Sequence, residues 1–228
     1  KIFFKGPFLK LINKKNNSII KLFKFLRKLK LISNYYSFTI NKNITVLGVL
    51  VGGTGNAASI LKVLLKGKVP KSLLNKAETI IGTDLRLFFY KQGFLSNLKT
   101  ITQYKKKKLF FILIKPNIRC STREIYSKVR KYSKKRLLVL NKINTKNKFI
   151  SVLSQENNDL QSIVEKKYPL IKKLLIAIRN EKGCCFSRMT GSGSVCYGLF
   201  KDQITAKKAL NKLKIKFPKF WISFAKTV

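Results

Sequence analysis

Apolar residues in the first half of the chain recur three and four positions apart, the spacing that lines one face of a helix. After the candidate N-caps Asn17 and Ser18, this spacing joins Ile19, Leu22, Phe23 and Leu26. Two more helices are predicted for residues 54–66 and 73–81, the second of which ends at Gly82. Residues 36–43, YSFTINKN, alternate as in a strand. The first half is therefore predicted to mix strands with helices.

The second half also combines both kinds of pattern. LFFILIKP, residues 109–116, predicts a buried strand that ends at a proline. Residues 184–200, CCFSRMTGSGSVCYGLF, predict two strands around a Gly-Ser-Gly turn, and residues 220–228 alternate as a closing strand. The segment STRE, residues 121–124, fits a capping box at the start of a helix. We therefore expect an α+β open sandwich in this half.

Start and stop signals predict three further helices in the second half. Asp159 is expected to cap a helix that runs through Val164, and Pro169 is expected to separate this helix from the next. Thr205 is expected to cap the last helix.

A polar, charged segment divides the two halves. Residues 104–108, YKKKK, interrupt the apolar patterns on either side. We therefore predict two domains, residues 1–104 and residues 105–228.

The charge of the chain is extreme for a sequence that can build a core. Fifty Lys and Arg residues against eight Asp and Glu residues give a formal net charge of +42. Such a balance is typical of nucleic-acid partners, but abundant Lys, Asn, Ile and Phe with no His also fit A/T-rich coding. Outside residues 105–108 the basic residues are spread along the chain instead of forming one stripe. This distribution argues against nucleic-acid binding as the main function and leaves non-specific binding as an expectation.

Several classes of protein are disfavoured by composition. The longest apolar run, residues 44–51, is too short to span a membrane, so no membrane partner is expected. The four cysteines, Cys120, Cys184, Cys185 and Cys196, form no CxxC pair, and without histidine this spacing is poor for zinc. Reduced thiols favour a cytoplasmic location, with the plastid stroma as the alternative. The chain begins KIFFKGPF without methionine, and we interpret this start as a truncation.

A glycine-rich stretch, VGGTGNAASILKVL, lies directly before and within the second predicted helix at residues 51–64. One interpretation is a flexible turn that precedes a helix. The other is an anion-binding site, because glycines let successive N–H groups turn inward and a helix N-terminus adds unpaired donors. The strand, loop and helix order fits the second interpretation, but local sequence alone leaves both open.

Four segments, in order, resemble the motifs of the GHMP small-molecule kinases. They are VGGTGNAASILKVL, GTDLRLFFY, KPNIRCSTREIYSKV and SRMTGSGSVCYGLF. The resemblance extends from GPF at Gly6 through Asn16-Asn17, Asn158-Asp159-Leu160 and Lys167-Tyr168-Pro169 to at least Phe200. It implies a two-domain α+β fold, with a truncated N-terminal part like ribosomal S5 domain 2 and a ferredoxin-like C-terminal domain.

The resemblance also implies an activity and a set of site residues. The members that the chain resembles transfer the γ-phosphoryl group of ATP, with Mg²⁺, to a hydroxyl of a cytidyl-diphospho-methylerythritol in isoprenoid biosynthesis. Asp84 matches the catalytic acidic residue, and Thr122 matches a threonine near it, although helix capping alone would explain Thr122. The residues expected at the phosphates are Gly52, Gly53, Thr54, Gly55, Asn56, Gly191, Ser192 and Gly193.

Departures from the family pattern qualify this interpretation. Val49 and Val51 stand where the family usually has glycine, so we expect weaker ATP binding. Thr45 and Arg86 stand where proline is usual, and Arg86 was a candidate partner for Asp84 or for a phosphate. Nothing in residues 1–8 matches the segment that carries the family's catalytic lysine, so we expect the chain as given to lack part of its active site. A basic nucleic-acid-binding protein and a non-catalytic remnant that binds nucleotide or nothing remain the alternatives.

Overall fold

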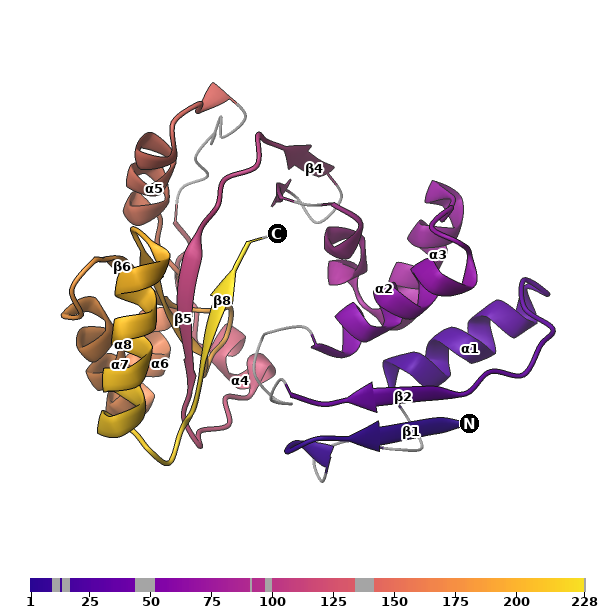
Figure 1. Ribbon diagram of the computed structural model, residues 1–228, viewed down its shortest axis with the longest axis horizontal. Helices are drawn as coiled ribbons and strands as arrows, with labels where there is room; N and C mark the ends of the chain where they lie inside the picture. The colour runs from indigo at the N-terminus through magenta and orange to yellow at the C-terminus, as the bar shows by residue number, and fades with distance from the viewer. Residues whose placement is uncertain are drawn as a thin grey trace. The chain divides into compact units, whose positions relative to one another are not determined.

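The computed structural model describes residues 1–9, 13, 17–43, 52–90, 92–96, 100–133 and 142–227. These residues form two compact units, which divide between Gln103 and Tyr104 (Figure 1). Each unit buries a hydrophobic cluster of its own.

In its described residues, the first unit combines three α-helices, a 3₁₀ helix and two pairs of strands. In chain order its elements are β1 (Ile2–Lys5), α1 (Ser18–Lys28), β2 (Phe38–Asn41), α2 (Gly52–Leu64), α3 (Lys71–Ile81), η2 (Thr83–Phe89), β3 (Gly93–Ser96) and β4 (Thr100–Gln103). Strands β1 and β2 pair in parallel, and β3 and β4 form an antiparallel hairpin. The apolar stripe of α1 and residues of α2, α3 and η2 fill the core, with Leu22, Leu26, Leu61 and Leu85 fully buried.

Local signals explain where the helices of the first unit begin and end. The side chain of Asn17 caps α1 by accepting hydrogen bonds from the amides of Ile19 and Ile20, as predicted. Helix α3 stops at Gly82, whose φ of +134° lies in a region that side chains rarely adopt. Helix α2 differs from the prediction because it starts at Gly52, so the glycines form its first turn and not a loop before it.

The second unit is an antiparallel sheet with helices on one face. Its elements are β5 (Phe110–Lys115), α4 (Thr122–Ser127), α5 (Lys146–Gln155), α6 (Gln161–Lys167), α7 (Pro169–Arg179), β6 (Cys184–Met189), β7 (Cys196–Phe200), α8 (Gln203–Lys216) and β8 (Trp221–Lys226). The sheet order is β6-β7-β5-β8, with every neighbouring pair antiparallel. Helices α6, α7 and α8 cover one face (Figure 1).

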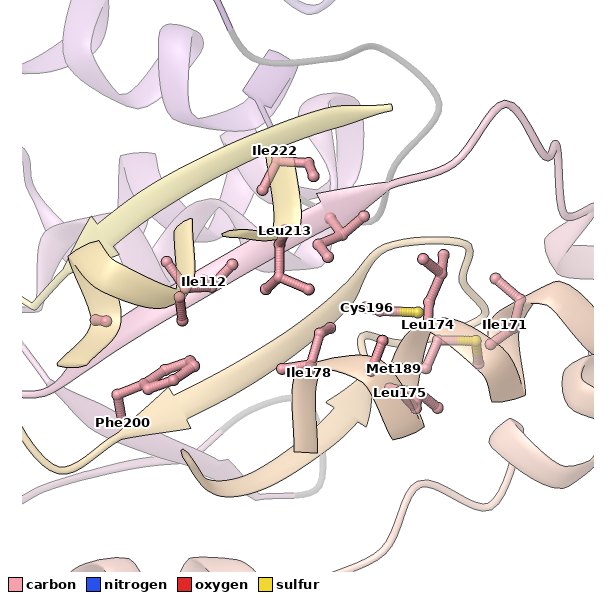
Figure 2. Close-up of a cluster of buried hydrophobic side chains, with 14 of the residues drawn as sticks. Ile112, Ile171, Leu174, Leu175, Ile178, Met189, Cys196, Phe200, Leu213 and Ile222 are labelled. Carbon is pink, nitrogen blue, oxygen red and sulfur yellow. The ribbon is translucent and has the colours of Figure 1, made fainter. Parts of the chain in front are cut away.

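The core of the second unit lies between that face and the helices. Figure 2 shows Ile112 of β5, Phe200 of β7 and Ile222 of β8 pointing toward the helices. The facing residues are Ile171, Leu174, Leu175 and Ile178 of α7 and Leu213 of α8. Most of these side chains are fully buried, as the helical spacing of α7 and the apolar β5 run predicted.

Two predicted helix caps are wrong. Asp159 accepts hydrogen bonds from Ser133, and Leu160 occupies the N-cap of α6 without a side-chain cap. At α8 the cap is Asp202, whose carboxylate accepts from the amide of Thr205 at 2.7 Å. An N-cap side chain accepts from an amide two or three residues later in the chain, and Thr205 provides that amide for the Asp202 cap.

Other elements were not predicted. Strand β1, the β3–β4 hairpin and helix α5 had no counterpart among the predicted elements, and α4 ends at Ser127. In the described part of the chain, no helix is long and apolar enough to cross a membrane.

Candidate active site

The first turn of α2 presents backbone donors at the start of a thirteen-residue helix. The first four N–H groups of any helix have no partner within the helix, and the helix dipole is positive at this end. In α2 these positions belong to Gly52, Gly53, Thr54 and Gly55. The hydroxyl of Ser18 donates a 2.7 Å hydrogen bond to the carbonyl of Gly53, which ties the turn to the start of α1. The turn therefore has the chemistry of an anion site.

Close packing explains two of the glycines. A Cβ on Gly53 would lie 3.1 Å from Ser18 Oγ. A Cβ on Gly55 would lie 2.9 Å from Cε1 of Phe88, a residue of η2. Glycine is therefore required here so that α1 and η2 can approach the turn.

Asp84 lies in η2, the segment that packs on this turn. Gly82, two residues before Asp84, faces α2, since a Cβ there would lie 4.0 Å from Thr54 Oγ1. At the other end of η2, Lys62 of α2 donates a 2.6 Å hydrogen bond to the carbonyl of Phe88. The Asp84 side chain is partly exposed. The first unit thus brings the predicted acidic residue and the predicted phosphate turn into neighbouring segments.

Arg86 bonds to Glu78, a residue that the sequence analysis did not single out. Its guanidinium donates to the carboxylate of Glu78 on α3, with Nε 2.5 Å from Oε1. This hydrogen bond is the main reason that the pKa of Arg86 lies above its ordinary value.

In the second unit, two predicted residues that are far apart in sequence come together. The hydroxyl oxygens of Thr122, at the start of α4, and Ser192, in the turn between β6 and β7, are 2.9 Å apart. Ser192 is buried and Thr122 is exposed, so the pair lies at the edge of the protein interior. Ser121 caps α4 through the amide of Glu124, as the capping box predicted.

The turn between β6 and β7 is held from two sides. The amide nitrogen of Asn158 donates to the carbonyls of Met189 and Gly191, at 2.9 Å and 2.8 Å. The hydroxyl of Ser194 donates to the carbonyl of Ile118 at 2.6 Å. These bonds fix Gly191, Ser192 and Gly193 between α6 and the segment after β5.

A buried lysine supports that segment. Lys115, at the end of β5, donates to the carbonyls of Pro116 and Ile118 at 2.6 Å and 2.8 Å. Burial lowers the pKa of its ammonium. The carbonyl of Ile118 therefore accepts from both Lys115 and Ser194, which couples the lysine to the turn.

An ion pair of Glu124 connects α4 to helix α6. Glu124 of α4 bonds to Lys128 at 3.1 Å and to Lys167 of α6. The hydrogen bond from Lys167 is the main cause that lowers the pKa of the Glu124 carboxyl.

Metal ligands of the usual protein types do not cluster in the described ranges. No group of three or more His, Cys, Asp or Glu side chains is placed to hold an ion there. The cysteines are free thiols, and burial raises the pKa of Cys184 to about 12. Thr45, Val49 and Val51 lie outside the described residues, so the expected effect of the two valines stays a prediction.

Comparison with known proteins identifies the family. Residues 144–219 match the family described as GHMP kinases C terminal. The chain is 35% identical over 234 residues to the 4-diphosphocytidyl-2-C-methyl-D-erythritol kinase of Pelagibacter ubique (strain HTCC1062), covering 100% of this chain and 82% of that protein. The chain belongs to the 4-diphosphocytidyl-2-C-methyl-D-erythritol kinase family. A kinase of the same name from Anaplasma marginale (strain Florida) is 28% identical over 192 residues, covering 80% of this chain and 65% of that protein.

Solved structures agree on the fold. A crystal structure of 4-(cytidine 5'-diphospho)-2C-methyl-D-erythritol kinase covers 100% of this chain with a TM-score of 0.72 at 20% identity, and 82% of that protein is covered. Homoserine kinase from Cytophaga hutchinsonii matches with a TM-score of 0.69 at 15% identity, over 100% of this chain and 81% of that protein. The predicted resemblance to GHMP kinases and the predicted α+β fold are both confirmed.

For this member of the 4-diphosphocytidyl-2-C-methyl-D-erythritol kinase family, two supporting residues were missed from the sequence. Ser18 follows the Asn17 cap, and no sequence signal marks its bond to the first turn of α2. Lys115 is one of many lysines, and only its place at the end of an apolar strand distinguishes it.

Proposed function

We propose that this chain transfers the γ-phosphoryl group of ATP to a hydroxyl of 4-diphosphocytidyl-2-C-methyl-D-erythritol, in isoprenoid precursor biosynthesis. The 35% identity to a kinase of that name along the whole chain is the observation that carries this proposal. The packing of the Asp84 segment on the glycine turn supports it, because phosphoryl transfer depends mainly on positioning.

We assign residues 1–104 to an ATP-binding domain and residues 105–228 to the C-terminal domain of this kinase family. The two compact units divide within one residue of that boundary. The family match at residues 144–219 lies in the second unit.

In this proposal the ATP phosphates lie at the first turn of α2. The N–H groups of residues 52–56 and the positive end of the helix dipole would stabilise them. Within the second unit, the turn of Gly191, Ser192 and Gly193 is a further proposed phosphate-binding segment, and the Ser192 hydroxyl lies 2.9 Å from that of Thr122.

Asp84 is the proposed base. Its carboxylate would accept the proton of the attacking hydroxyl, or hold that hydroxyl in line with the γ-phosphorus. Thr122 of the second unit is a proposed catalytic residue only through its match to the family motif.

The residues at the α2 turn fit a magnesium ion. Mg²⁺ is commonly bound through one or two protein oxygens together with substrate phosphates, so a dedicated cluster of carboxylates is unnecessary. The Thr54 hydroxyl, which faces Gly82 on the Asp84 segment, would hold the ion with the phosphate oxygens. When bound, the ion would neutralise charge that develops on the transferred group.

A cytoplasmic location fits the proposal. Cys120, Cys184, Cys185 and Cys196 are all free thiols, as expected in a reducing compartment.

Transfer of radioactive phosphate from γ-labelled ATP tests this function. The protein, expressed together with any coding sequence upstream of Lys1 so that the expected catalytic lysine is supplied, is incubated with Mg²⁺, ATP and either 4-diphosphocytidyl-2-C-methyl-D-erythritol or homoserine, the acceptor suggested by the second structural likeness. We expect label only in the cytidyl compound and none after EDTA is added. Transfer to homoserine alone would contradict the proposal, and ATP binding without any transfer would favour the non-catalytic remnant.

A further inference from the structure

Contacts at the start, middle and end of the segment that carries Asp84 attach it to the rest of the first unit. Its start follows the C-terminus of α3, where the amide of Gly82 bonds to the carbonyl of Glu78 at 2.9 Å. Leu85 is fully buried in the core, and the carbonyl of Phe88 accepts from Lys62. Between these anchors lies the ion pair of Arg86 and Glu78.

This ion pair is bidentate. Nε and Nη2 of Arg86 bond to the two different carboxylate oxygens of Glu78. A bidentate bond between two planar groups fixes orientation as well as distance, which a single-point contact does not. The pair joins residues eight positions apart and so links η2 to the last turns of α3.

The pair is also shielded from water. The side chains of Arg86 and Glu78 are 18% and 7% exposed, and Glu78 is the one buried acid among the described residues. A buried carboxylate with a partly exposed partner is costly to desolvate, and apolar residues of similar size often stabilise a fold as well. Fold stability alone therefore gives a weak reason for an ion pair at this place.

The position of the ion pair beside Asp84 gives a better reason for its presence. Arg86 lies two residues after Asp84, and η2 is a 3₁₀ helix, a conformation with poorer hydrogen-bond geometry than an α-helix. Such a segment needs outside contacts to keep one orientation. We propose that the Arg86–Glu78 ion pair is the positioning element that holds Asp84 in its orientation beside the first turn of α2. This inference rests on the proposed kinase function.

Two changes separate positioning from stability. Arg86→Lys keeps the charge but loses the fork that bonds both oxygens. The double variant Glu78→Leu with Arg86→Met replaces the pair by apolar side chains, so folding is retained while the orienting bonds are lost. Leu26→Ala is the matched control, because it opens a cavity in the same core from α1, away from η2.

We expect kcat for the cytidyl substrate to fall about 10-fold to 100-fold in Arg86→Lys and in the double variant. The KM for ATP should stay within about twofold, since the phosphate turn belongs to α2. Leu26→Ala should lower the melting temperature and leave kcat unchanged. Full kcat in the double variant would overturn the proposal and leave the pair a purely structural role.

Hydrogen exchange gives a second readout that does not need activity. Amides of residues 83–90 should exchange faster in Arg86→Lys than in the wild type, while amides of α2 keep their protection. Unchanged exchange in residues 83–90 would overturn the proposal. A wild type without transfer would contradict the kinase function alone, because the exchange measurement still decides the role of the pair.

Discussion

Asp84 is one of eight acidic residues in the chain, and its carboxylate lies at the start of η2. Asp84→Asn keeps the size of the side chain and removes the proton acceptor. We expect single-turnover transfer to fall by about two to four orders of magnitude, which is the usual contribution of a positioned general base. ATP affinity, measured by calorimetry, should be unchanged, because the proposed phosphate site belongs to a different segment, the first turn of α2. Unchanged transfer in the Asn variant would remove Asp84 from the site.

The pKa of Lys115 depends on its burial in the second unit. Burial lowers the pKa of Lys115, so the unfolded chain holds this proton at pH values just below 10.5, where the folded chain has begun to release it. The contribution of Lys115 to stability therefore rises as the pH approaches 10.5. We expect the unfolding free energy of the wild type, minus that of Lys115→Met, to increase over this range in urea titrations. A difference that falls with pH would contradict the burial of a charged ammonium.

Asp84 and the glycine-rich turns could be selected from the sequence as candidate site residues, because they belong to short motifs in a fixed order. Ser18 and Lys115 could not, since their partners are backbone carbonyls at Gly53 and Ile118 that no sequence pattern marks. The same limit applies to Arg86. Its pairing with Glu78 requires the 3₁₀ helix η2 to fold back toward α3. No sequence pattern indicates this change of chain direction.

At the level of elements, long apolar patterns predicted α1, α3, α7 and β5 well, because each has one buried face. The short strands β1, β3 and β4 have four residues each, and alternation over four positions is a weak signal. The start of α2 was misplaced because glycine is a poor helix former, and the turn is stabilised by its contacts with Ser18 and Phe88.

Contact between α7 and the sheet provides a test of packing. A Cβ on Gly198 of β7 would overlap Cγ2 of Ile178 on α7. Gly198→Ala should therefore lower the unfolding free energy by about 1–3 kcal/mol, the usual effect of overpacking a core. Adding Ile178→Leu, which moves the branch away from Cβ at constant volume, should recover part of that loss. Fluorescence of the single tryptophan, Trp221 in β8, can follow urea unfolding of this unit.

Equal stability of Gly198→Ala and the wild type would contradict the close contact between α7 and β7. Ile178→Leu alone is the control, because a volume-conserving change should cost little by itself.

For the whole molecule, the dominant property is the net charge of +42. Like charges spread over one folded chain repel one another, and dissolved salt screens this repulsion. We expect the melting temperature to rise as sodium chloride is increased from about 10 mM to 200 mM. Potassium chloride should have the same effect, and a melting temperature that falls with salt would show that specific ion pairs outweigh the repulsion.

The same charge bears on the alternative of a nucleic-acid-binding protein. Binding that depends on charge alone should be non-specific and should weaken steeply with salt, because it comes from the release of counterions. Filter binding of one RNA against scrambled competitors, over the same salt series, checks this. Retention of a single RNA at high salt would place nucleic-acid binding ahead of phosphoryl transfer.

The scarcity of acids has a consequence for how this sequence can change. Glu78 holds Arg86, Glu124 holds Lys128 and Lys167, and Asp202 caps α8, so each of these acids has a structural contact to lose. With only eight acids in the chain, most of the fifty basic residues cannot form an ion pair with an acidic side chain. In a library of random variants we therefore expect unequal tolerance. Lysines would be exchanged freely and often with a gain in stability, while the few acidic positions would be the ones that selection keeps.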